Sequence, residues 1–162
     1  IKGEDIDIVV DLDITSPLRK LNDLENAIEK LKIDNNIDVV YSVVPSRRSP
    51  YFNMVEKKGN YYKKICESNY TARQQAPETY ELNASIYAYN PKFLKSNIEK
   101  TILDYDCDII IMDDYLVLDI DSEDDFVMMA QLLDIWIQKD IDLKRVIDEA
   151  SVMNKGRKTI IM

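Results

Sequence analysis

Short apolar runs alternate with stretches of helical spacing along this chain, and that pattern is typical of an α/β fold. The runs predict strands at Ile6–Asp13, Asp38–Val44, Asn83–Asn90, Ile109–Met112 and Tyr115–Ile120. Apolar residues three and four positions apart, or a proline in the first turn, predict helices at Leu21–Leu31, Pro91–Ile98, Asp124–Gln138 and Leu143–Met153. Strand, helix and strand follow in order at the start, so we expect a βαβ unit in a mainly parallel sheet covered on both faces.

The segment between the second and third expected strands has the pattern of an inserted β-hairpin. Tyr51–Glu56 and Tyr61–Cys66 flank the turn Lys57–Asn60, which contains a glycine. The insertion covers about residues 50–67, and a polar, irregular stretch follows it up to Glu81. With 162 residues, the chain suits one domain, which we place at residues 1–153 with residues 154–162 as a tail or linker.

Composition narrows the range of functions. The chain has 30 acidic and 21 basic residues and a net charge of −9, which argues against binding to nucleic acid or to an anionic membrane. It contains no histidine and two cysteines, so histidine-based catalytic triads and cysteine-rich zinc sites are excluded. No apolar run approaches the roughly 20 residues of a membrane span, and we expect a cytoplasmic protein with free thiols.

Two carboxylates at the end of the last expected strand are the most informative feature. Asp119 and Asp121 are two residues apart, and such residues on a strand point to the same face. Together they could reach one Mg²⁺ ion, which is commonly held by a few carboxylates and a substrate's phosphates. The next acids, Glu123–Asp125, have a simpler interpretation, because Ser122 is a suitable N-cap and acids in a first turn favour the helix dipole. The helix that follows carries an apolar stripe, which we expect to be core: Phe126, Met129, Ala130, Leu133 and Ile137.

Two other acid-rich strand ends support a rival interpretation. The Asp11–Thr15 segment resembles the first motif of haloacid dehalogenase-type phosphatases, and the Ile109–Asp114 segment resembles their last motif. The resemblance implies that Asp11 is the nucleophile and Asp13 the general acid/base. Ser42 would then bind phosphate, and Asp113 and Asp114 would hold magnesium.

A longer resemblance covers most of the chain. Four segments, in order, resemble successive motifs of the acylneuraminate cytidylyltransferases: Thr15–Arg19, Ser49–Phe52, Arg73–Tyr87 and Leu118–Phe126. The family joins CTP to a sialic-type nonulosonic acid, giving a CMP-sugar and pyrophosphate with magnesium. This resemblance implies a three-layer, Rossmann-like nucleotidyltransferase fold. It also implies a homodimer with contacts built by the hairpin.

The resemblance also implies roles for individual residues. Asp119 and Asp121 would be catalytic and would hold Mg²⁺ or Mn²⁺. Arg73 would face the sugar carboxylate, while Asn83 and Tyr87 would line the sugar pocket. The remaining substrate-binding candidates are Asp13, Thr15, Ser16, Arg19 and Gln74. A guanidinium can pair a carboxylate in bidentate fashion, and carboxylates on one metal offset the charge that builds during displacement at a phosphate.

The chain departs from the family pattern at one substrate-binding position. Asp13-Ile14 stands where the family's commoner form has Gln-Pro, and that glutamine contacts the sugar. Either Asp13 joins the metal, as in the related Kdo cytidylyltransferases, or the sugar acid differs from ordinary sialic acid. N-Acetylneuraminic, legionaminic and pseudaminic acids therefore all remain candidate substrates.

The second departure concerns the CTP phosphates. The family begins with a strand and a Gly-, Arg- and Lys-rich loop that holds them, and Gly3 alone does not supply that loop. Three interpretations stay open: the chain is part of a longer enzyme, a partner supplies the loop, or the chain is a noncatalytic sugar-binding or dimerisation module. We expect the isolated 162 residues to turn over CTP poorly or not at all, and robust pyrophosphate release by them would contradict this expectation.

Overall fold

A computed structural model describes residues 6–96, 99–139, 144–145 and 148–149. The chain divides into two compact units, residues 1–119 and residues 120–162. The first contains two β-sheets, and the second contains the long helix α3, Glu123–Lys139. Among the described residues, no helix combines the length and apolar character that crossing a membrane requires.

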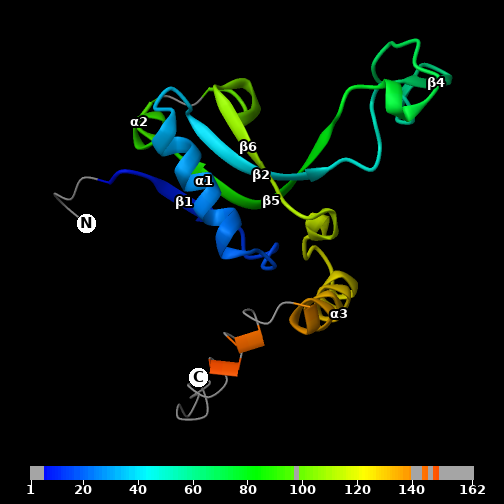
Figure 1. Ribbon diagram of the computed structural model, residues 1–162. Coiled ribbons are helices and arrows are strands. Elements are labelled where there is room, and N and C mark those ends of the chain that lie inside the picture. The colour runs from blue at the N-terminus through cyan, green and yellow to red at the C-terminus, as the bar shows by residue number, and fades with distance from the viewer. Residues whose placement is uncertain (1–5, 97–98, 140–143, 146–147, 150–162) are drawn as a thin grey trace. The chain divides into compact units, whose positions relative to one another are not determined.

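The main sheet of the first unit has four strands in the order β1-β5-β2-β6 (Figure 1). They are β1 (Val9–Leu12), β2 (Val39–Pro45), β5 (Tyr80–Tyr89) and β6 (Cys107–Ile111). β5 pairs antiparallel with both β1 and β2, whereas β2 and β6 pair in parallel. β1, β2 and β6 therefore run in the same direction, with β5 opposed to them.

The fold is α/β as expected, but the expected mainly parallel sheet is not what the described strands form. The first βαβ unit does bring two strands into the same direction, yet β5 lies between them and pairs antiparallel with both. The order of strand, helix and strand at the start of the chain predicts the shared direction of β1 and β2, but it carries no information on a later strand that enters the sheet between them.

Helix α1 (Leu21–Ile33) lies across one face of this sheet (Figure 1). Its buried residues are Ala27 and Leu31, which are four positions apart and therefore lie on one side of the helix. Residues of β2 alternate between the two sheet faces. Val39, Tyr41 and Val43 form the core on one face, together with side chains from β5, β6 and the 3₁₀ turn η2 (Ile102–Asp104).

The short helix α2 (Pro91–Leu94) follows β5 directly and has the expected proline in its first turn. Asn90 is its N-cap, and the Asn90 side chain accepts a hydrogen bond from the backbone N–H of Lys92 at 3.0 Å. Phe93 of this helix is buried and packs edge-on against Tyr105, with 4.9 Å between ring centroids.

The predicted hairpin is present, but its first strand begins at Val55 instead of Tyr51 and includes two residues of the predicted turn, Lys57 and Lys58. Strands β3 (Val55–Lys58) and β4 (Tyr61–Lys64) pair antiparallel around a turn in which Gly59 has φ +64°. That left-handed conformation explains the glycine. The hairpin begins beyond the carboxyl end of β2 (Figure 1).

Two predictions near the end of the first unit need correction. β5 begins at Tyr80, three residues earlier than expected, inside a stretch predicted to be irregular. The predicted strand Tyr115–Ile120 is wrong, because Asp114–Val117 forms the 3₁₀ turn η3, which is closed by the Leu116 N–H bonding to the Asp113 carbonyl at 2.9 Å. The argument that Asp119 and Asp121 share a strand face therefore loses its basis.

Helix α3 begins where the sequence predicts. The Ser122 hydroxyl accepts a hydrogen bond from the backbone N–H of Asp125 and donates one to the Asp125 carboxylate at 2.7 Å. Its buried residues are Met129 and Trp136, whereas Phe126 is 56% exposed, so only part of the predicted core stripe is correct. The predicted helix Leu143–Met153 lies largely outside the described residues, as does the whole of segment 154–162.

The pairing of β5 with β2 contains one wide irregularity. Tyr41 is opposite Tyr87 and Val43 is opposite Leu82, so Ser42 alone is opposite four residues, Asn83–Ile86. Ala84, inside this bulge, has φ +52°. That is the left-handed region, which a residue with a Cβ atom adopts at a cost.

We predict that Ala84→Gly stabilises the protein and that the same change at Ala88 destabilises it. Glycine at position 84 relieves about 1–2 kcal/mol of backbone strain in the folded state. It also increases the conformational entropy of the unfolded chain, which offsets part of that stabilisation, so the free energy of unfolding should rise by about 0.5 kcal/mol. Ala88 is a fully buried strand residue with no such strain, so Ala88→Gly should lose about 1 kcal/mol. Urea unfolding of both variants measures the difference, and equal destabilisation by the two changes would contradict the strain at Ala84.

Candidate functional site

The carboxyl ends of β1, β2 and β6 lie on one edge of the sheet, together with the amino end of β5. This edge is where ligands bind in many open α/β sheets. Three polar segments follow these strand ends: the 13–19 turn after β1, the 46–48 loop after β2, and the acidic pair Asp113 and Asp114 after β6. The topology thus brings together motifs far apart in the sequence.

The turn after β1 is built around Arg19. The Arg19 guanidinium donates to the carbonyl of Ser85 at 2.8 Å, to the carbonyl of Ser16 at 2.9 Å, and to the carbonyl of Asp13. Ser16 is buried, and the Ser85 hydroxyl donates to its carbonyl at 3.2 Å. Burial lowers the pKa of Arg19, and the nearby charge of Asp13 opposes that shift. In this structure Arg19 and Ser16 hold the turn against the β5 bulge.

Asp13 is held by Thr15. The backbone N–H of Thr15 donates to the Asp13 carboxylate at 2.8 Å, and the Thr15 hydroxyl donates to the same oxygen at 2.7 Å. The backbone bond is the larger cause that lowers the pKa of Asp13, followed by the hydroxyl bond. The Asp13 carboxylate is therefore ionised at neutral pH, and its second oxygen is available to a cation or to a substrate hydroxyl.

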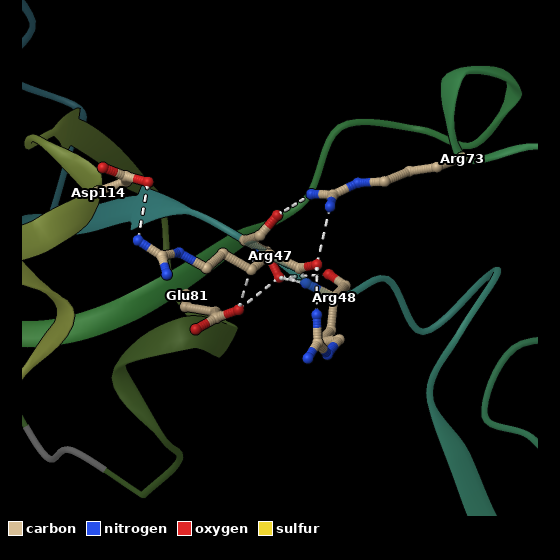
Figure 2. Close-up of polar contacts among 6 residues, drawn as sticks. Arg47, Arg48, Arg73, Glu81 and Asp114 are labelled. Atoms are coloured by element: carbon tan, nitrogen blue, oxygen red, sulfur yellow. Dashed lines mark hydrogen bonds and ion pairs between the residues drawn. The ribbon is translucent and has the colours of Figure 1, made fainter.

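The loop after β2 is fixed by Arg73 and Glu81 (Figure 2). Arg73, in the 3₁₀ turn η1 (Arg73–Gln75), donates to the backbone carbonyl of Arg47 at 2.8 Å and to that of Ser46. The Glu81 carboxylate accepts from the Ser46 hydroxyl at 2.6 Å and from the Arg47 N–H at 3.2 Å. The loop is thus held from both sides by charged groups.

A cavity of about 640 Å³ opens beside this loop. Arg73 and Gln74 line it, together with Ser46, Ser49 and Thr79. The cavity has the size of a small-molecule site. A guanidinium carries five N–H donors, and the bonds to Ser46 and Arg47 use two of those of Arg73. Arg73 therefore retains donors for an anionic ligand in this cavity.

The acidic pair after β6 forms ion pairs with basic side chains from two different parts of the chain. The Lys20 ammonium is 2.6 Å from the Asp113 carboxylate, which also accepts from the Tyr115 hydroxyl at 2.9 Å. Arg47 is 3.1 Å from the Asp114 carboxylate (Figure 2). The hydrogen bond from Lys20 is the largest cause that lowers the pKa of Asp113 and, in turn, raises that of Lys20. Both pairs are solvent-exposed, so they anchor this segment weakly and depend on salt.

Asn83 and Ser42 form a buried polar pair inside the β5 bulge. The Ser42 hydroxyl donates to the Asn83 side-chain oxygen at 2.6 Å and accepts from the Ile86 N–H at 2.9 Å. The Asn83 side-chain nitrogen donates to the Leu116 carbonyl at 3.1 Å and lies 3.3 Å from the Met112 sulfur. Asn83 is 3% exposed, so its amide faces protein groups in this structure.

Tyr87 lies further along β5 and does not line the cavity beside Arg73. Its ring stacks on Tyr89, with 6.3 Å between centroids, and burial is the largest cause that raises its pKa. The sugar-pocket role that the family resemblance implies for Tyr87 therefore stays a prediction.

Asp119 is the last residue of the first unit and is half-buried, whereas Asp121 is the second residue of the second unit and is exposed. Neither carboxylate has a hydrogen-bond or ion-pair partner among the described residues, in contrast to Asp113 and Asp114. No group of three or more His, Cys, Asp or Glu side chains within the described ranges is arranged to hold a metal ion. The metal-binding role of Asp119 and Asp121 therefore stays a prediction.

Sequence reasoning missed three parts of this edge: Glu81, Ser46 and the two ion pairs. The paired arginines at Arg47 and Arg48, directly after a buried strand, were the available signal for the loop. No local pattern indicated that Lys20 would meet Asp113, because 93 positions separate them in the chain.

No protein-family model matches the chain. It is 36% identical over 127 residues to the post-translational flagellin modification protein B of Campylobacter coli, a match that covers 78% of this chain and 53% of that protein. It is 40% identical over 92 residues to the CMP-N,N'-diacetyllegionaminic acid synthase of Campylobacter jejuni, covering 57% of this chain and 38% of that protein.

These relatives support the resemblance to the CMP-nonulosonic acid synthetase family that the four ordered sequence motifs indicate. The matched region spans about half, or less, of the length of these curated relatives.

We predict that Thr15→Val raises the pKa of Asp13 while leaving it below the ordinary value of an aspartate. The change removes the hydroxyl donor and keeps the backbone N–H, which is the larger cause of the lowered pKa. A pH titration of the Asp13 carboxyl carbon by NMR measures the shift. Thr101→Val is the matched control, since the Thr101 hydroxyl donates to Asp104 instead. A pKa of Asp13 that is unchanged by Thr15→Val would contradict the observed bond.

Proposed function

We propose that this chain forms part of a cytidylyltransferase that transfers CMP from CTP to a legionaminic-type nonulosonic acid and releases pyrophosphate. The observation that carries the proposal is the shared sheet edge, where the Thr15–Arg19 and Arg73–Tyr87 motifs meet although they are far apart in sequence. The similarity to a CMP-N,N'-diacetyllegionaminic acid synthase supports the choice of sugar acid.

The proposed contact to the sugar carboxylate is Arg73. Its guanidinium is fixed by two backbone carbonyls and lines the cavity with Gln74, so its remaining donors are pre-oriented toward an anion. Pre-orientation matters because a free arginine side chain loses rotamer freedom on binding. The Gln74 amide can bond sugar hydroxyl or acetamido groups in the same cavity.

Asp13 supports a substrate other than ordinary sialic acid. An ionised carboxylate accepts hydrogen bonds only, whereas a glutamine both donates and accepts. The Thr15 bonds hold Asp13 in that ionised form and leave one oxygen free. A sugar acid that presents a donor at this position is favoured over one that presents an acceptor.

Asp119 and Asp121 would hold Mg²⁺, and Asp13 is a candidate third ligand. The ion, when bound, offsets the charge of the triphosphate. The carboxylates themselves are suited to this role because, among the described residues, they are not engaged with any cation.

The hairpin supports a homodimer. Val55, Tyr61 and Tyr62 are each at least 60% exposed on its two short strands. Exposed aromatic and aliphatic side chains gathered on one projecting element are typical of an interface.

The phosphatase alternative is not favoured. Ser42, its proposed phosphate ligand, is 1% exposed, and its hydroxyl is already bonded to Asn83 and Ile86. Asp113 and Asp114, its proposed magnesium ligands, are instead paired separately with Lys20 and Arg47.

We predict that Asp119→Ala and Asp121→Ala, each made in the complete protein, lower CMP transfer by more than about a hundredfold. That figure exceeds the loss typical of groups that only support a metal ligand. The assay supplies CTP, Mg²⁺ and N,N'-diacetyllegionaminic acid, and follows pyrophosphate and the CMP-sugar by mass spectrometry. N-Acetylneuraminic acid in the same assay tests the choice of sugar.

Asp124→Asn is the control for the two alanine variants, since Asp124 is an exposed acid in the first turn of α3 and should leave activity nearly unchanged. Full activity in both alanine variants, or loss of hydrolysis of a phosphate monoester in Asp11→Asn, would overturn the proposal.

A further inference from the structure

We infer that Ser42 and Asn83 are positioning residues, which fix the segment between β6 and Asp119 and act on the reaction through it. The inference rests on the proposed function for its catalytic consequence, but the tether itself is a property of this chain. It assigns Asn83 a role different from the sugar contact that the family resemblance implies.

The tether is a chain of three bonds from the sheet to the segment. The Ile86 N–H donates to the Ser42 hydroxyl, the Ser42 hydroxyl donates to the Asn83 side-chain oxygen, and the Asn83 nitrogen donates to the Leu116 carbonyl. The distances are 2.9, 2.6 and 3.1 Å. Ser42 and Asn83 are 1% and 3% exposed, so water does not compete for these bonds.

The segment between β6 and Asp119 depends on such a tether because it no longer pairs with a neighbouring strand of the sheet. β6 ends at Ile111, and the last ladder-like contact is the Met112 N–H to the Val43 carbonyl at 2.8 Å. The 3₁₀ turn Asp114–Val117 follows, and Asp119 comes two residues after it. Leu116 is buried and its carbonyl is the acceptor for Asn83, three residues before Asp119.

The two other anchors of the segment are of a different kind. Lys20 to Asp113 and Arg47 to Asp114 join exposed side chains, so salt weakens both. A buried, charge-neutral bond keeps its strength at any ionic strength. Asn83 therefore sets the position of Leu116, while the ion pairs adjust the segment's outer face.

A sugar contact by Asn83 would require breaking this network. The amide has two donor hydrogens and one oxygen, and it uses both kinds of group on protein atoms. Turning it toward a ligand would leave the Leu116 carbonyl and the Ser42 hydroxyl without their buried partners, which is unfavourable. Positioning is thus the role that the observed bonds support.

The first test is hydrogen exchange on the 162-residue chain. In Ser42→Ala and in Asn83→Ala, the amides of residues 112–119 should exchange about five- to tenfold faster, the ratio expected when one hydrogen bond is lost. Tyr41→Phe is the matched control, because Tyr41 neighbours Ser42 on β2 but its hydroxyl contacts Cys107. Unchanged exchange of residues 112–119 in both alanine variants would overturn the tether.

A measurement on the unmutated chain covers the case in which the variants fail to fold. If Asn83 bonds Leu116, its side-chain amide protons should be protected from exchange and should show nuclear Overhauser contacts to Met112 and Leu116. Rapid exchange of those protons, without such contacts, would equally overturn the tether.

The second test separates positioning from sugar binding in the complete protein. Positioning through Asp119 predicts that Ser42→Ala and Asn83→Ala raise the Mg²⁺ concentration for half-maximal activity several-fold and leave the KM for the sugar acid unchanged. A raised sugar KM with unchanged Mg²⁺ dependence would overturn the inference. If the unmutated protein makes no CMP-sugar, the proposed function fails, whereas hydrogen exchange still decides the tether.

Discussion

The pairing of β2 with β5, and the bulge within it, is the constraint on which the rest of the first unit depends. One residue of β2 is opposite four of β5, so the strand must leave the ladder and return to it. The Ser42 hydroxyl replaces the missing backbone partner of Ile86. Ala84 adopts a strained left-handed backbone conformation within this bend.

The bulge connects three of the sequence motifs. On one side, the Ser85 carbonyl accepts from Arg19 and from the backbone N–H of Asp13, which fixes the turn after β1. On the other side, Asn83 reaches Leu116 and fixes the segment that leads to Asp119. A bulge re-aims side chains that a regular strand would send to alternating faces. Neighbouring residues of one strand can therefore support two separate motifs.

Much of the fold follows from the sequence, and the errors have physical causes. α1, β2, the hairpin and α3 were predicted because each carries a local signal: helical spacing, a continuous apolar run, a glycine turn or an N-cap serine. Strand direction and the η3 turn were missed because both depend on partners far away in the chain. Leu116 belongs to an apolar run that looks like a strand, but tertiary bonds to Asn83 and the turn at Asp113 decide its conformation.

The candidate site shows the same contrast between what local sequence patterns indicate and what depends on partners far away in the chain. The family resemblance implies substrate contacts for Arg73, Asp13 and Asn83 alike, but the chemistry that each can perform depends on the bonds it makes in the fold. Arg73 has donors left over after holding its loop, Asp13 keeps one free oxygen, and Asn83 has both kinds of polar group engaged. Residue type and spacing do not distinguish these three cases, because a group is available to a ligand only to the extent that the fold leaves it unbonded.

The placement of charged side chains bears on how an acidic chain would bind the anionic substrates proposed for it. The net charge of the chain is −9, yet the basic side chains of Lys20, Arg47 and Arg73 all lie near the sheet edge where β1, β2 and β6 end. Lys20 and Arg47 form ion pairs with Asp113 and Asp114. The negative charge of these two acids is therefore partly neutralised, and they repel a bound anion less. Asp119 and Asp121 have no such compensation among the described residues, and a triphosphate would therefore be repelled until a cation neutralises them. If the proposed function holds, binding of the nucleotide and binding of the metal are coupled, because each ligand reduces the electrostatic repulsion that opposes the other.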